Sequence, residues 1–201
     1  MEIIEAIKKP FSDWGKLAIG SVLGLIPIAN FAVMGYGLQN VKSPKKLPEF
    51  SWETFVMGLK CLGVGIVYSL LTFLVMLPFI FGAIGPIVNM IITQTLDVAA
   101  LMSMFGVLAV GLLVGVLSLP ANIGARLRLG RTESLSEALK VFEVLKYSYN
   151  WKFVKHVLLA LLVGIPIAFV GGLIPVVGFA VANYVMMVFM WSYIGENAPK
   201  L

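Results

Sequence analysis

The chain has 201 residues, of which 60% are hydrophobic and only 12% are charged, and its mean hydropathy is +0.98. An ordinary soluble domain carries about 25% charged residues, and it could not hide several apolar runs of about 20 residues in one core. We therefore expect an all-α integral membrane protein, because backbone amides in lipid must be satisfied within each helix and no alternating barrel pattern occurs. The net charge of +5 then marks topology and contacts with membrane lipids, and we expect no nucleic-acid partner.

Residues 1–10 predict a short interfacial helix. Ile3, Ile4 and Ile7 share one helical face, charged residues occupy the others, and Pro10 ends the segment. A frayed terminus is the alternative for so short a segment.

An internal repeat organises the first and the last apolar runs. Residues 24–36 match residues 172–184 at eight of thirteen positions, and both segments begin with Gly-Leu-Ile-Pro. We expect two helical hairpins, over 14–41 and 151–195, that arose by duplication. Chance similarity of two apolar stretches is the alternative.

The two hairpins differ in the length of their limbs. Each limb of 151–195 has about 20 residues and reaches ~30 Å, so this hairpin is predicted to cross the bilayer twice. The limbs of 14–41 reach only ~20 Å. That segment is therefore predicted to be either a re-entrant hairpin or one span kinked at Pro27.

Two further spans are predicted over 55–81 and 98–120, which gives four transmembrane helices in a single membrane domain, 1–201. With a re-entrant first hairpin, all fifteen Lys and Arg lie on one side together with both termini. By the positive-inside rule this side is cytoplasmic. The four Trp residues then gather at the inner interface, where amphipathic rings anchor helix ends.

The polar inner segments carry the basic residues that we expect to contact anionic head groups. A second amphipathic helix is predicted over 134–149, because Ser134 and Glu137 form a capping-box pattern before an apolar stripe. We expect this helix along the inner membrane surface, and an exposed cytosolic helix is the alternative. The candidate lipid contacts are Lys42, Lys45, Lys46, Arg126, Arg128 and Arg131.

Several short motifs in combination resemble a known family. They are Gly35-Tyr36 before a basic stretch, Leu47-Pro48-Glu49-Phe50-Ser51-Trp52, Gly58-Leu59-Lys60 and Ser136-Glu137-Ala138. With these motifs the chain resembles, over nearly its whole length, the archaeal membrane family called domain of unknown function 4013. Phe50 stands where the family usually has Trp. The resemblance implies an archaeal plasma-membrane protein and supplies no catalytic or ligand residue.

Polar side chains at membrane depth are costly and usually face protein or water. The candidates for a polar pathway are Asn30, Asn89, Thr93, Asp97 and Asn183. Asn89, Thr93 and Asp97 follow an i, i+4, i+8 stripe that predicts an outer vestibule. The alternative is an outer interfacial helix over 85–97 with Asp97 in water. The asparagines of the two hairpins either line a cavity or join helices by hydrogen bonds.

No catalytic, metal or cofactor site is predicted, because Cys61 and His156 are the single residues of their kinds and no nucleotide-binding fingerprint occurs. We therefore expect no enzyme. The Gly-rich faces at Gly20-xxx-Gly24 and Gly111-xxx-Gly115 predict packing within the chain or a homo-oligomer. The leading hypothesis is permeation or transport of an ion or small solute, from the Pro-broken hairpins. The alternative is a non-catalytic membrane scaffold that binds lipid or a partner.

Overall fold

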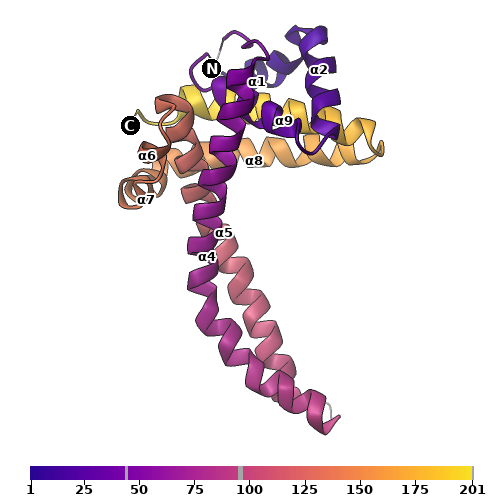
Figure 1. Ribbon diagram of the computed structural model, residues 1–201, viewed down its shortest axis with the longest axis vertical. Coiled ribbons are helices and arrows are strands. Elements are labelled where there is room, and N and C mark those ends of the chain that lie inside the picture. Colours follow the sequence, from indigo (N-terminus) through magenta and orange to yellow (C-terminus); the bar gives the residue numbers. More distant parts are fainter. Residues whose placement is uncertain (44, 95–96, 201) are drawn as a thin grey trace. The chain divides into compact units, whose positions relative to one another are not determined.

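The computed structural model describes residues 1–201 except 44, 95, 96 and 201, and the described part contains no strand (Figure 1). Its contacts divide the chain into two compact units, one formed by Met1–Gly65 with Pro120–Leu201 and the other by Ile66–Leu119. In chain order the helices are α1 (Ile3–Lys8), the 3-10 helix η1 (Lys9–Ser12), α2 (Trp14–Leu25), α3 (Asn30–Gln39), α4 (Trp52–Thr93), α5 (Val98–Thr132), α6 (Leu135–Ala138), α7 (Val141–Ser148), α8 (Trp151–Gly172) and α9 (Val177–Asn197).

Four helices, α4, α5, α8 and α9, are long and apolar enough to cross a bilayer. The all-helical fold class is thereby confirmed, and the four helices indicate a membrane-embedded protein. The two middle helices are longer than the predicted spans over 55–81 and 98–120, because α4 continues through Pro78 and Pro86 to Thr93. The separate helix considered over 85–97 is therefore absent from the part of the chain that the structure describes, and its first residues belong to α4.

The smaller unit, Ile66–Leu119, contains the second part of α4 and the first part of α5. The two segments approach each other at Gly111, where a Cβ atom would lie 3.3 Å from Met76 Cε, whereas Cβ atoms on Gly82, Gly85, Gly106 and Gly115 would meet nothing within 4 Å. Most side chains along both segments are exposed and apolar, including Phe81 at 65% and Leu112 at 72%. Such a surface is stable in a hydrocarbon solvent and not in water.

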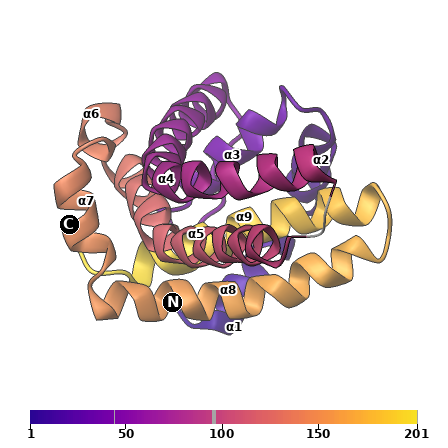
Figure 2. The same ribbon diagram turned by 90° about the horizontal axis from the view of Figure 1, so that it is seen from below.

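The larger unit contains both predicted hairpins. The first is α2 and α3, where Asp13 caps α2 by accepting a hydrogen bond from Lys16 N at 3.0 Å. The second is α8 and α9, which lie side by side (Figure 2). Pro27 lies in the turn of the first hairpin and Pro175 in the turn of the second. The placement of the first hairpin in lipid and the origin of both hairpins by duplication stay predictions.

Helix α9 is the packing centre of the larger unit, because α1, η1, α2, α3 and α8 all contact it. The aromatic core joins the two hairpins at Tyr36 and Tyr184, whose ring centroids lie 5.7 Å apart. Phe50 also stacks on Tyr36, with ring centroids 4.1 Å apart. The small residue Gly20 lies against the Tyr184 ring, so this glycine face serves packing within the chain.

The short amphipathic segments also form helices. The segment predicted as a helix over 1–10 is α1 followed by η1, and the one predicted over 134–149 is divided into α6 and α7 near Lys140. Ser134 caps α6 by accepting from Glu137 N at 3.4 Å. Phe142 on α7 is 89% exposed, which suits the proposed contact of this helix with a membrane surface.

Candidate functional site

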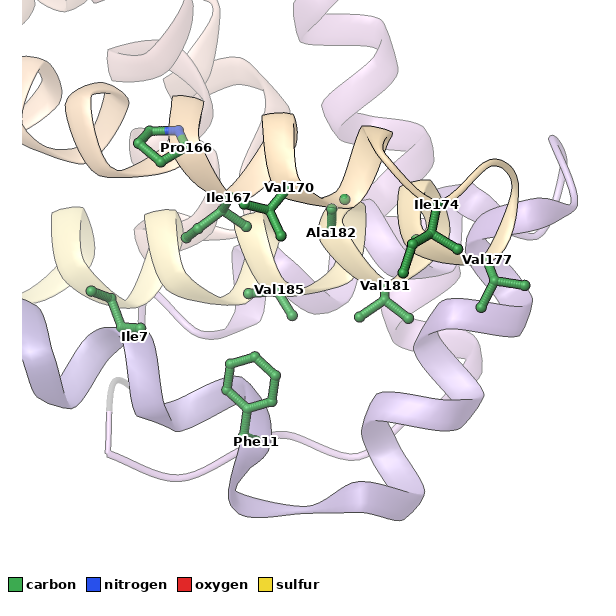
Figure 3. Close-up of a pocket in the computed structure, with 12 residues that line it drawn as sticks. Ile7, Phe11, Pro166, Ile167, Val170, Ile174, Val177, Val181, Ala182 and Val185 are labelled. Atoms are coloured by element: carbon green, nitrogen blue, oxygen red, sulfur yellow. The ribbon is translucent and has the colours of Figure 1, made fainter.

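The larger unit contains an apolar groove between α1, η1, α8 and α9, with a volume of about 500 Å³ (Figure 3). Ile7 and Phe11 form the wall on the N-terminal segment. Phe11 points from η1 toward Val185 of α9. The remaining lining comes from the second hairpin, mainly Pro166, Ile167, Val170, Ile174, Val177, Val181 and Val185.

Helical periodicity explains why these side chains meet in one groove. Val177, Val181 and Val185 are spaced by four residues, so they form one stripe along α9. Ile7 and Phe11 have the same spacing on the N-terminal segment. The groove residues nearest the turn between α8 and α9 are strongly exposed, and the exposed fraction of Val177 is 63%. An apolar groove of this kind offers a chain-shaped hydrophobic ligand contact without any polar partner.

Two of the groove residues, Gly171 and Gly178, bring α8 and α9 together. A Cβ atom on Gly171 would lie 2.7 Å from the carbonyl oxygen of Gly178, and a Cβ atom on Gly178 would lie 2.7 Å from Ile174 Cβ. Only residues without a side chain allow this approach of the two backbones. The shape of the groove is therefore determined by the close approach of the two backbones as well as by the rotamers of its side chains.

The candidate pathway residues fall into two separate groups. In the larger unit, Asn183 donates from Nδ2 to Asn30 Oδ1 at 3.1 Å, so the two hairpin asparagines are brought together. Gly24 lies beside this pair, since a Cβ atom there would be in ordinary van der Waals contact with Asn183 Nδ2 at 3.4 Å. Of the two alternatives for these asparagines, this contact is the hydrogen bond that joins helices.

In the smaller unit, the predicted stripe is interrupted. Helix α4 ends at Thr93, and Asp97 lies beyond that end, directly before α5. Thr93 donates from Oγ1 to the carbonyl oxygen of Asn89 at 2.9 Å, and Asp97 accepts from Ala99 N at 2.8 Å. The contacts of Asp97 are thus those of a helix-capping carboxylate.

Three of the six candidate lipid contacts have partners within the chain. Lys42 Nζ donates to Glu133 Oε1 at 2.6 Å. Arg128 donates to Glu137 Oε2 at 2.6 Å and also to Glu143. Hydrogen bonds from Lys140 and from Arg128 lower the pKa of Glu137. This network fixes α6 and α7 against the end of α5.

Arg131 has the most extensive set of partners among the basic candidates. Its guanidinium donates to the carbonyl oxygens of Gly195, Ala198 and Pro199 at 3.1, 3.1 and 2.6 Å. These carbonyls belong to the end of α9, where a cation interacts favourably with the helix dipole. Tyr147 donates to the same Pro199 oxygen at 2.7 Å, and burial raises the pKa of its phenol.

The other three basic candidates are placed differently. Lys45 and Lys46 are exposed in the segment after α3. Arg126 points at α4, because a Cβ atom on Gly65 would lie 2.9 Å from Arg126 Nη2. Contacts of these residues with lipid stay predictions.

Lys9 was not predicted as a site residue from the sequence, where it counted only among the basic residues of the inner side. Lys9 is 7% exposed, and its ammonium donates to Asn40 Oδ1 at 2.6 Å and to Ser192 Oγ at 2.9 Å. A third bond runs to the carbonyl oxygen of Ser43 at 2.9 Å. Burial lowers the pKa of Lys9 to about 8, against the opposing charge of Glu196. A local sequence signal was lacking, since Asn40 and Ser192 lie 31 and 183 residues away.

In the part of the chain that the structure describes, four helices long and apolar enough to cross a bilayer indicate a membrane-embedded protein. The chain belongs to the family described as "Protein of unknown function (DUF4013)", whose profile matches residues 19–176. No curated protein and no solved structure matches the chain. The resemblance inferred from the sequence motifs is confirmed at the level of the family.

Proposed function

We propose that this protein is a non-catalytic membrane protein that binds a lipid, with one hydrocarbon chain of the lipid in the groove between η1, α8 and α9. The observation that carries the proposal is the groove itself, which has about 500 Å³ of space and an almost wholly apolar lining. A hydrocarbon chain gains dispersion contacts there that bulk lipid does not make with a convex helix surface.

Permeation of an ion or small solute was the leading hypothesis from the sequence, and the contacts of the candidate residues favour lipid binding over it. A pathway needs polar groups that face an open cavity. Asn30 and Asn183 bond to each other, and Asp97 Oδ1 accepts from Ala99 N at the start of α5, as a helix cap does. Lipid binding requires none of these groups.

The cellular setting follows from the sequence and is part of the proposal. We place the protein in an archaeal plasma membrane with both termini in the cytoplasm and with residues 14–41 as a re-entrant hairpin. Labelling of single cysteines in a Cys61→Ala background tests this topology. Labelling at position 5 only from outside the cell would contradict it and favour the span kinked at Pro27.

A lipid with a photoreactive diazirine in its chain tests the binding function directly. The protein is purified in mild detergent, crosslinked, and digested so that the labelled residues are identified by mass spectrometry. We expect labels to concentrate on residues 166–185, which contain most of the groove lining. Even labelling along all exposed apolar helices would contradict a specific groove.

A pair of substitutions on one helix provides the control. Val170 lines the groove and is 63% exposed, so Val170→Phe adds a ring to the groove without disturbing the buried core. Ile165 is 65% exposed on the same helix and is outside the groove lining, so Ile165→Phe changes a surface that faces bulk lipid. Crosslinking should fall in the first variant only, and equal yields in both variants would refute the proposal.

A further inference from the structure

A second cavity lies beside the N-terminal segment, in the same unit as the groove. It has a volume of about 430 Å³, and most of its lining residues carry a charged or hydroxyl group. The lining residues are Met1, Glu5, Lys8, Lys9, Ser12 and Lys45. Three lysines and the N-terminal ammonium of Met1, which pairs with Glu196 at 3.2 Å, therefore surround this cavity together with the carboxylate of Glu5.

Lys9 brings a buried positive charge to the wall of this cavity. All three hydrogen-bond partners of its ammonium are neutral oxygens, on Asn40, Ser43 and Ser192. In the part of the chain that the structure describes, no carboxylate forms an ion pair with Lys9. The lowered pKa agrees with this geometry, because burial outweighs the charge of Glu196. A buried cation without a direct counter-ion is costly, and an anion in the adjacent cavity would remove that cost.

Two further lysines supply the donors that a bound anion needs. Lys8 and Lys45 are exposed, and neither forms an ion pair with any residue that the structure describes. Their ammonium groups can therefore turn to a ligand in the cavity without breaking an existing contact. Ammonium groups in this number attract phosphate, which accepts several charge-assisted hydrogen bonds at once.

The cavity and the groove are formed by adjacent faces of one short segment. Ile7 and Phe11 line the groove, and the next residues in the chain, Lys8 and Ser12, line the cavity. Successive helical residues project about 100° apart, so the two sites are neighbours around α1 and η1. One lipid molecule, with an apolar chain and a charged head group, matches this pair of sites in chemistry.

We propose that the cavity binds the phosphate of an anionic membrane lipid, with Lys8 and Lys45 as donors and with the phosphate as the counter-ion of Lys9. The inference rests on the proposed function, because the chain of the same lipid occupies the groove. It adds the class of ligand: an anionic phospholipid is preferred over a zwitterionic one with identical chains.

Binding is measured on the full chain in nanodiscs that contain phosphatidylglycerol or phosphatidylcholine with the same acyl chains, by native mass spectrometry of retained lipid. The test variant is Lys8→Gln combined with Lys45→Gln. The control variant, Lys152→Gln combined with Lys155→Gln, removes two exposed lysines that do not line the cavity. Each lysine near a phosphate contributes roughly fivefold in affinity, so the test variant should lose about 25-fold for phosphatidylglycerol. The control variant should retain the preference of the wild type.

The outcomes separate this inference from the function on which it rests. Equal retention of both lipids by the wild type, with crosslinking still sensitive to Val170→Phe, would overturn the head-group site and leave the groove intact. Crosslinking insensitive to Val170→Phe would overturn the proposed function itself. Inorganic phosphate is the second probe, and its binding without displacement of phosphatidylglycerol would show that the cavity takes a free anion instead. An unchanged thermal midpoint in both double variants confirms that each is folded.

Discussion

Helix α3 and the start of α4 approach closely at two glycines, Gly35 and Gly58, and Gly58→Ala tests the importance of this contact. A Cβ atom at position 58 would meet the carbonyl oxygen of Phe31 and would lie 3.0 Å from Phe31 Cα. The contact is reciprocal, since a Cβ atom on Gly35 would lie 2.6 Å from Gly58 N. A backbone carbonyl cannot rotate away as a flexible side chain can, so α3 and α4 must separate.

The expected magnitude combines two opposing effects. Overpacking of a close contact costs about 1–3 kcal/mol, and the upper part of this range applies because the obstructing atoms belong to the backbone of α3. The better helix propensity of alanine returns up to about 1 kcal/mol. We therefore expect Gly58→Ala to lower the free energy of unfolding by about 2 kcal/mol.

Titration with sodium dodecyl sulfate in dodecylmaltoside micelles, followed by circular dichroism, measures this change. Gly63→Ala on the same helix is the control, because a Cβ atom at position 63 meets nothing within 4 Å. The control should be neutral or more stable than the wild type by up to about 1 kcal/mol. If the two variants unfold at the same detergent fraction, the tight packing of α3 on α4 is refuted.

Three more predictions concern charged groups. Folding lowers the pKa of Lys9 from 10.5 to about 8. Between these two pH values the unfolded chain keeps a proton that the folded chain releases, so the free energy of unfolding should rise by about 3 kcal/mol from pH 8 to 10.5. The variant Lys9→Met should lack this rise in the same titration. Arg131→Gln should lower the free energy of unfolding by about 1.5–3 kcal/mol because it removes charged hydrogen-bond donors from the end of α9. A loss below about 0.5 kcal/mol would show that those bonds contribute little. Asp97→Asn should leave proteoliposome cation flux at the level of empty liposomes, as in the wild type, and a wild-type flux that falls in the variant would support permeation instead.

Hydropathy alone located the four candidate spans, because a run of about 20 apolar residues has few alternatives to a membrane helix. It could not locate the ends of α4, since Pro78 and Pro86 are compatible with an apolar helix and look like turn signals in the sequence. The helix over 134–149 was predicted as one piece because Lys140 carries no breaking signal, yet the chain turns there between α6 and α7.

The candidate site was less accessible from the sequence than the fold. The valines of α9 looked like an ordinary apolar span, and only the position of η1 beside them makes a groove. A lysine in a short amphipathic segment is usually solvated, so nothing local distinguished Lys9 from Lys8. The pairing of Asn30 with Asn183 was one of two alternatives, and the choice depends on contacts 153 residues apart in the chain.

The position of α9 at the packing centre affects how the protein is made. Its contacts with the first part of the chain join residues that are far apart in sequence, as the pairs Lys9–Ser192 and Tyr36–Tyr184 show. Contacts of such high sequence separation form late. At a synthesis rate of about 5–20 residues per second, the first hairpin waits roughly ten to thirty seconds before α9 exists. During this interval Lys9 and Asn40 lack the partner on Ser192. The insertion machinery therefore handles an incompletely packed, polar N-terminal segment for most of the time that the ribosome needs to finish the chain.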